Sequence, residues 1–316
     1  MLKPSAQPIP RHAADFLDWL DVERGLSSKS QENYSRFLNK FLEWLKLKNL
    51  EHLKPHELSP DHIWNYRVFL ARQYLPRTKQ PLKKSTQNYY LIALRSLLNY
   101  FSHRDILSLP AEKVTLARDK AERQVRFLLL DQLEKLFAAP DIHTPQGVRD
   151  RAMLETLFST GMRVAELVSL NRNQLRLRAG TRDFELGIIG KGQRVRTVYF
   201  SERALEWLRR YLAARTDQEK ALFINFRGPR HAPRRLTVRS VEKMIKRYAI
   251  LAGLPPNTTP HVMRHSFATD LLNQGVDLRT IQEFLGHKSI AATQIYAHVT
   301  SKKLREIHKK FHGKNA

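Results

Sequence analysis

Hydrophobic residues recur at a helical spacing throughout residues 11–105. They lie three or four positions apart, which places them on one face of a helix and leaves polar residues on the other. Four such stripes predict four amphipathic helices. The stripes contain Phe16, Trp19 and Leu20; Tyr34, Phe37, Leu38, Phe41, Leu42 and Leu45; Ile63, Tyr66 and Leu70; and Tyr90, Leu94, Leu97 and Phe101.

Residues that favour helix ends separate these stripes. Glycine ends a helix readily, serine and threonine cap its first turn, and proline fits its first position. The predicted ends are Gly25 after the first helix, Ser27 or Ser28 before the second, Ser59 with Pro60 before the third, and Ser85 or Thr86 before the fourth. The sequence therefore predicts a helical N-terminal domain over residues 1–108.

The pattern changes after this domain. Residues 109–124 have no clear periodicity and are rich in charge, which predicts a linker. Helical stripes return beyond the linker at residues 130–138, 147–159, 162–170 and 237–252. We therefore expect a second domain over residues 125–316.

Two segments of this second domain alternate as strands do. Residues 184–189 and 194–200 lie on either side of a Gly-Lys-Gly turn, which predicts an antiparallel hairpin. Residues 222–226 are compatible with a third strand. The expected fold is mainly α, with a small antiparallel sheet in the C-terminal domain.

The end of the chain returns to short helical patterns. Thr259 and Pro260 predict an N-cap and a first helical position, and Gly275 predicts the end of that helix. Further helices are predicted at 277–285 and 289–299, followed by a basic helix at 301–311.

Charge narrows the class of partner. The 316 residues contain 55 Lys and Arg against 30 Asp and Glu, a net charge of +25. Residues 1–118 hold 19 basic and 11 acidic residues, and residues 119–316 hold 36 and 19. Because both halves are basic, we expect the chain to surround a polyanion, and nucleic acid is the predicted partner.

Two further features of the composition exclude classes of protein. The chain has no cysteine, which excludes disulfides, cysteine-bound zinc and a thiol nucleophile. No run of about 18 apolar residues predicts a membrane span, and residues 1–16 do not resemble a signal peptide. The expected location is the cytoplasm, in association with the nucleoid.

Residues capable of chemistry gather in the stretch 259–300. They are His261, Arg264, His265, His287 and Tyr296. Arg264 falls in the first turn of its predicted helix, where backbone N–H groups and the positive end of the helix dipole favour an anion. A guanidinium, protonatable imidazoles and a tyrosine hydroxyl together suggest chemistry on a phosphodiester.

A metal site is the alternative reading of the histidines. His261 and His265 are four residues apart, as zinc ligands on a helix often are. The metalloprotease pattern, however, requires glutamate directly after the first histidine, and Val262 stands there. No metal or other cofactor is predicted, and His265 is expected to be structural.

Upstream residues leave two interpretations open. Arg163 and Glu166 are three residues apart, so they form either a surface ion pair or an arginine oriented on a phosphate by its own carboxylate. Lys191, between two glycines at the hairpin tip, is either a solubilising charge or a proton donor. Candidate contacts to DNA phosphates are Lys83, Lys84, Arg95, Arg230, Arg234 and Arg235.

Five motifs in this order resemble the tyrosine recombinase (phage integrase) family, most closely its Xer-type members. They are TGMRVAEL, the GKG hairpin, HVMRHSFAT, LGH and ATQIYAHV. The resemblance covers the second domain and extends to the first, which it implies to be a SAM-like four-helix core-binding domain. The second domain would be the catalytic one.

The resemblance implies a role for each matching residue. Arg163 and Arg264 would hold the scissile phosphate, Glu166 would pair with the first arginine, and Tyr296 would be the nucleophile. The remaining catalytic positions are His261, His287 and Lys191. It also implies a tetramer on paired DNA sites, closed by docking of the C-terminal segment on a neighbouring subunit, and it is compatible with activation by a DNA translocase.

Four functions are compatible with these observations. The favoured one is a site-specific recombinase that resolves chromosome dimers through a 3′-phosphotyrosyl intermediate and a Holliday junction. The same family also contains integrases of phages, integrons and transposons, and enzymes that relax DNA as monomers. A DNA-binding protein on the same fold, without cleavage, is the alternative from another class.

Overall fold

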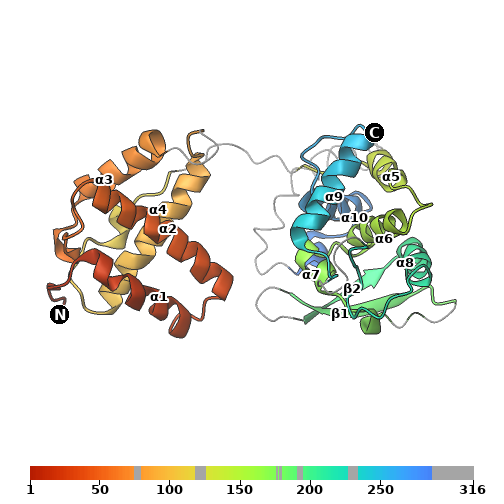
Figure 1. Cartoon of the computed structure of the whole chain (residues 1–316), viewed down its shortest axis with the longest axis horizontal. Helices are drawn as coiled ribbons and strands as arrows, with labels where there is room; N and C mark the ends of the chain where they lie inside the picture. The colour runs from red at the N-terminus through yellow and green to blue at the C-terminus, as the bar shows by residue number, and fades with distance from the viewer. Residues whose placement is uncertain are drawn as a thin grey trace, which may run out of the picture. The chain divides into compact units, whose positions relative to one another are not determined.

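The computed structural model describes residues 1–74, 80–117, 126–175, 177, 180–190, 195–226 and 234–286. The chain divides into two compact units, Met1–Glu122 and Arg123–Ala316 (Figure 1). Each unit has its own hydrophobic core.

The N-terminal unit contains the four predicted helices. They are α1 (Ala13–Val22), α2 (Ser28–Leu47), α3 (Pro60–Val68) and α4 (Lys84–His103). Helix α2 packs against α1 and α4, and a π-helical turn, Phe69–Gln73, extends α3. Aromatic side chains fill much of the core, with Phe16, Phe41, Trp44, Tyr66 and Phe101 almost completely buried.

The helix ends test the predicted caps. Ser59 accepts a hydrogen bond from the backbone N–H of His62, so the predicted cap of α3 is confirmed. Helix α4 instead begins before Ser85, and its N-cap is Lys83, whose side chain makes no capping hydrogen bond. The predicted Ser85 or Thr86 cap is therefore wrong, because the chain is extended at Lys83 and turns helical directly after it.

The segment after α4 packs on the N-terminal unit. Ala111 and Val114 are buried in its core, and Asn88 exchanges two hydrogen bonds with the backbone of Ala117, at 2.9 and 3.0 Å. Residues 109–117, predicted to be the first half of the linker, are thus held by both apolar and polar contacts. The two charged residues of this segment, Glu112 and Lys113, lie between the buried Ala111 and Val114.

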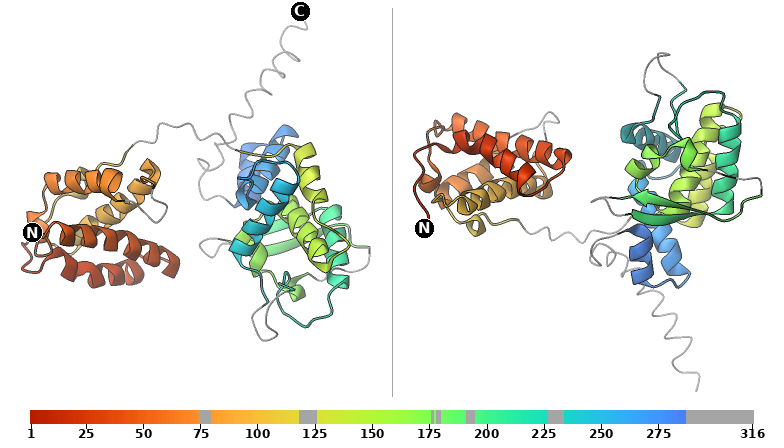
Figure 2. Two further views of the ribbon diagram at one scale, coloured as in Figure 1. Left: turned by 45° about the horizontal axis from the view of Figure 1, so that its top comes forward. Right: turned by 90° about the horizontal axis from the view of Figure 1, so that it is seen from below.

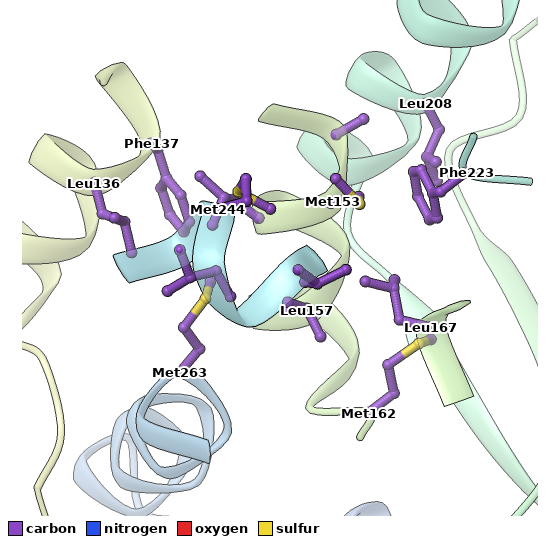
Figure 3. Close-up of a cluster of buried hydrophobic side chains, with 14 of the residues drawn as sticks. Leu136, Phe137, Met153, Leu157, Met162, Leu167, Leu208, Phe223, Met244 and Met263 are labelled. Carbon is purple, nitrogen blue, oxygen red and sulfur yellow. The ribbon is translucent and has the colours of Figure 1, made fainter. Parts of the chain in front are cut away.

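The C-terminal unit is also mainly helical, as predicted. Its helices are α5 (Leu130–Ala138), α6 (Pro145–Thr160), α7 (Val164–Ser169), α8 (Glu202–Ala213), α9 (Val238–Leu251), α10 (Pro260–Asn273) and α11 (Leu278–Leu285). Helix α6 is central, with ten of its 16 residues buried, and it contacts α5, α7, α8 and α10. Figure 3 shows Met153 and Leu157 of α6 in the core, among Met244 of α9 and Met263 of α10.

The predicted hairpin is present. Strands β1 (Phe184–Ile189) and β2 (Val195–Phe200) pair antiparallel, with Ile189 opposite Val195. Strand β2 contacts both α6 and α11, and Figure 2 shows the strands close to the blue helices α10 and α11. The hairpin therefore lies next to α11, at the C-terminal end of the described residues.

The predicted third strand is wrong. In the described part of the C-terminal unit, residues 222–226 make only a single bridge, between Ile224 and Arg235. Leu222, Phe223 and Ile224 are all buried, so this apolar run fills the core instead of presenting alternate side chains to solvent. A short apolar run in a sequence does not by itself distinguish a strand from an irregular segment that is buried in the core.

The central position of α6 leads to a prediction about stability. Leu157 is 1% exposed, so Leu157→Ala leaves a cavity and is expected to lower the free energy of unfolding by about 2–5 kcal/mol. Denaturant unfolding of the full chain measures this loss. Leu251→Ala, at a leucine that is 68% exposed, is the matched control, with an expected change within about 0.5 kcal/mol. Equal losses for the two variants would contradict the central role of α6.

Candidate active site

A glycine turn between α6 and α7 sets the position of the first arginine. Gly161 has φ +57°, a left-handed conformation that favours glycine. A Cβ added there would lie 2.4 Å from the ring of Phe267, so the space also requires glycine. The turn places Arg163 at the N-cap of α7.

Glu166 holds Arg163 in two ways. The backbone N–H of Arg163 donates to Oε2 of Glu166 at 2.7 Å, and its Nη1 donates to Oε1 at 3.1 Å. The Glu166 side chain is 7% exposed, whereas that of Arg163 is 29% exposed. The contact is therefore more than a surface ion pair, because the same buried carboxylate caps the helix and pairs with the guanidinium.

A second arginine, Arg196 of β2, completes the environment of Glu166. Its Nη1 and Nη2 donate to Oε1 and Oε2 of Glu166 at 2.9 and 2.7 Å, a bidentate pair. The sequence interpretation missed this residue. One signal was available, since strand alternation places Arg196 on the same inward face as the buried Val198 and Phe200.

These contacts decide the protonation state of Glu166. Burial of the carboxyl by itself raises its pKa. Hydrogen bonds from Arg196 and from the backbone of Arg163, together with the two guanidinium charges, outweigh burial and leave the pKa below its ordinary value. Glu166 is therefore ionised at neutral pH.

Helix α10 supplies a third arginine. Thr259 accepts a hydrogen bond from the N–H of Val262 and Pro260 opens the helix, so the predicted start is confirmed. Arg264 lies one turn further and is 5% exposed. Its Nη1 donates to the carbonyl oxygen of Gly161 at 2.7 Å, which fixes it beside the turn that carries Arg163.

The C-terminal end of α11 joins the three arginines, which we call the arginine cluster (Arg163, Arg196 and Arg264). Asp277 caps the start of α11, and Gly286 ends it with φ +61°. Three successive carbonyl oxygens accept from the cluster: Phe284 from Arg196 Nε at 3.2 Å, Leu285 from Arg264 Nη2, and Gly286 from Arg163 Nη2 at 3.5 Å.

The end of a helix suits this arrangement. Its last carbonyl groups have no partner within the helix, and its dipole is negative there, so guanidinium groups are favourable partners. The three guanidinium charges of the arginine cluster and the one carboxylate charge of Glu166 sum to a net charge of +2. A phosphodiester or its charged transition state is an anion that such a site stabilises.

The two histidines of α10 differ in environment. His261 is exposed in the first turn, whereas His265 is partly buried. Burial, with the nearby charges of His261 and Arg264, lowers the pKa of His265 to about 4. A neutral imidazole at this position is consistent with the structural role that we predicted for His265.

Several predicted site residues lie outside the described residues. They are Lys191, Arg230, His287 and Tyr296, and the helices predicted at 289–299 and 301–311 lie there too. Of the described candidates for DNA contact, Lys83 and Lys84 are exposed at the start of α4, and Arg95 and Arg234 are partly exposed.

The guanidinium of Arg235 forms hydrogen bonds within the C-terminal unit. Its Nη1 donates to the carbonyl oxygens of Val168 and Leu170 at 2.6 and 2.9 Å, at the end of α7. Its Nη2 donates to the side chain of Asn171. These contacts help to hold α7, and contact of Arg235 with DNA stays a prediction.

The described residues also bear on metal binding and on membrane insertion. Within those ranges, no group of three or more His, Asp or Glu side chains is arranged to hold a metal ion. None of the helices described there is both long enough and apolar enough to span a membrane.

Comparison with known families identifies the class of protein that has this four-helix unit and this second helical unit. The model described as "Phage integrase family" matches residues 126–303, and that described as "Phage integrase, N-terminal SAM-like domain" matches residues 13–105. The chain belongs to the phage integrase family and is a tyrosine recombinase. The expected SAM-like and catalytic folds are thereby confirmed.

The relatives of this chain within the family include Xer recombinases. Tyrosine recombinase XerD of Lacticaseibacillus casei is 36% identical over 306 residues, covering 95% of this chain and 97% of the relative. Tyrosine recombinase XerC of Pelotomaculum thermopropionicum is 35% identical over 313 residues, with 95% and 97% coverage.

Solved structures show the same fold over nearly the whole chain. The crystal structure of XerA recombinase has a TM-score of 0.51 and 27% identity, with 97% of this chain and 99% of that one covered. XerH bound to palindromic difH substrate has a TM-score of 0.74 and 21% identity, with 97% and 98% coverage.

Proposed function

We propose that this chain is an Xer-type site-specific recombinase that cuts and rejoins duplex DNA through a 3′-phosphotyrosyl intermediate and a Holliday junction. The observation that carries the proposal is the arginine cluster. Arg163 and Arg264 donate to neighbouring carbonyl groups at the end of α11, and Arg163 pairs with an ionised, buried carboxylate. The identity with XerD and XerC relatives over nearly the whole chain supports the Xer type.

In the proposed reaction, Arg163 and Arg264 bind the non-bridging oxygens of the scissile phosphate. Guanidinium groups stay charged and are planar, so each can donate two parallel hydrogen bonds, which lysine cannot do. The guanidinium of Arg163 is partly exposed, and its Nη2 donates to the carbonyl oxygen of Gly286 at 3.5 Å, a long contact that a phosphate oxygen can readily replace.

Tyr296 attacks the phosphorus in line, and the 5′ oxygen leaves. The phenol has an ordinary pKa of about 10, so it must lose its proton during attack, and His261 is the proposed acceptor. Lys191 is the proposed donor of a proton to the leaving oxygen, and His287 is proposed to contact the phosphate. The tyrosine ester conserves the energy of the broken bond, so rejoining needs neither ATP nor another cofactor.

The biological role is proposed from the relatives. We propose that four copies, alone or with a paralogue, assemble on two recombination sites in the cytoplasm, at the nucleoid. The C-terminal segment would dock on a neighbouring subunit, and resolution of chromosome dimers would serve chromosome partition at cell division. A DNA translocase would be the activator.

The test is a nicked suicide duplex that carries a site from the host's chromosome-terminus region, with EDTA and without ATP. We expect a covalent protein–DNA complex whose attached peptide contains Tyr296, recombination only between paired sites, and a four-subunit complex by light scattering. Relaxation of supercoiled DNA without paired sites would indicate a monomeric relaxer instead. A DNA shift without a covalent complex would favour the binding protein.

A further inference from the structure

We infer that Arg196 is a positioning residue of the active site, which holds Glu166 so that Arg163 remains directed at the phosphate. The inference rests on the proposed function. It concerns a residue outside the predicted set of Arg163, Lys191, His261, Arg264, His287 and Tyr296. Arg196 acts through Glu166 and the end of α11, and it is not proposed to touch DNA.

The first step is the division of Glu166 between two arginines. Arg196 donates to both carboxylate oxygens, at 2.9 and 2.7 Å, whereas the Arg163 guanidinium donates to this carboxylate once, through Nη1 at 3.1 Å. The carboxylate therefore orients Arg163 without engaging its whole fork. The side chain of Arg196 is 10% exposed, so solvent does not weaken its pair strongly.

The second step considers the Glu166 carboxylate in the absence of Arg196. Glu166 would remain buried and negatively charged with one guanidinium nearby, and a buried charge is costly unless it is paired. It would then draw Arg163 into a bidentate pair of its own. Because phosphate oxygens need the same donors, the carboxylate would compete directly with the substrate.

The third step connects Arg196 to the other parts of the site. Its Nε donates to the carbonyl oxygen of Phe284, and a Cβ added to Gly286 would lie 2.7 Å from its Cδ. Arg196 thus packs closely against the end of α11. The next carbonyl groups along this end accept from Arg264 and Arg163, so Arg196 fixes the surface against which both phosphate-binding arginines rest.

The test compares Arg196→Gln with the unaltered chain on the suicide duplex, under single-turnover conditions. We expect the cleavage rate at saturating protein to fall roughly 10- to 100-fold, since a misplaced catalytic group loses rate on that scale. The dissociation constant for DNA is expected to change less than about twofold, because many other cations bind the phosphates. A general loss of folded protein would weaken DNA binding as well, so a change in the cleavage rate alone indicates a role in positioning.

A matched control removes a comparable ion pair elsewhere in the same unit. Arg203 contacts Glu155 at 2.8 Å, and Glu155 keeps Arg151 as its second partner, just as Glu166 keeps Arg163. Arg203→Gln is expected to cleave at the rate of the unaltered chain. If Arg196→Gln fails to fold in a thermal melt, Arg196→Lys takes its place, which keeps the charge and loses the bidentate geometry.

A double-mutant cycle with Glu166→Gln tests whether Arg196 acts through Glu166. We expect Arg196→Gln to change the rate less than about twofold when Glu166 is already replaced. If the losses of the two substitutions are additive, the inference about Arg196 is wrong but the proposed function stands. The same holds if the unaltered chain cleaves DNA and the Arg196 variants cleave it at the same rate. No covalent complex from the unaltered chain would overturn the proposed function, and the inference with it.

Discussion

Tyr296→Phe is expected to abolish the covalent protein–DNA complex while leaving DNA binding unchanged. The substitution removes one oxygen, the atom that would form the phosphotyrosyl bond, and keeps the ring. Loss of a nucleophile typically costs more than roughly 10⁴-fold in rate, so the covalent band should fall below detection. The suicide duplex measures the band, and a gel shift on the same duplex measures binding.

Tyr199→Phe is the control for this prediction. Tyr199 is 52% exposed on β2, in the same unit, and its ring contacts Phe284 edge-on. The substitution keeps this ring contact, so normal cleavage is expected. A Tyr296→Phe variant that still forms the covalent complex would show that another residue attacks the phosphate.

Arg264→Lys and Arg264→Ala are expected to lower the single-turnover cleavage rate by about 10²- to 10³-fold, equivalent to about 3–4 kcal/mol of transition-state stabilisation. Lysine keeps the charge but cannot reach Gly161 and Leu285 while also donating to phosphate, because it lacks the planar fork. Quenched time courses at saturating protein measure the rate.

The control for Arg264 separates catalysis from charge. Arg279→Lys, at an exposed position of α11, changes the same kind of side chain without altering the cluster, and it is expected to cleave normally. A thermal melt checks that the Arg264 variants are folded, since Arg264 is buried. Near-normal cleavage by a folded Arg264→Ala would remove this residue from the proposed mechanism.

Local patterns in the sequence predicted most of the helices and the hairpin. The alternation in 184–189 and the stripe in 130–138 have the bounds of β1 and α5, because each is a single apolar face with clear ends. The prediction nevertheless omitted α8. Its signals were present, namely the Ser201 cap and the buried Leu205 and Leu208 three residues apart.

The site shows where local patterns stop being informative. Spacing placed Arg163 and Glu166 near each other, but Arg196 reaches Glu166 from 30 residues away through the packing of β2 against α11. No periodicity encodes that contact. The resemblance of the motifs assigned roles to Lys191, His287 and Tyr296, and those roles stay predictions.

The end of α11 has a consequence for the thermodynamics of the free protein. Three guanidinium charges held around one carboxylate repel one another, and this repulsion opposes folding of the C-terminal unit. A phosphodiester that binds only the folded unit relieves the repulsion and, by linkage, raises the stability of the fold. Binding of DNA and folding of this unit are therefore coupled, because the bound phosphodiester offsets the positive charge of the arginine cluster.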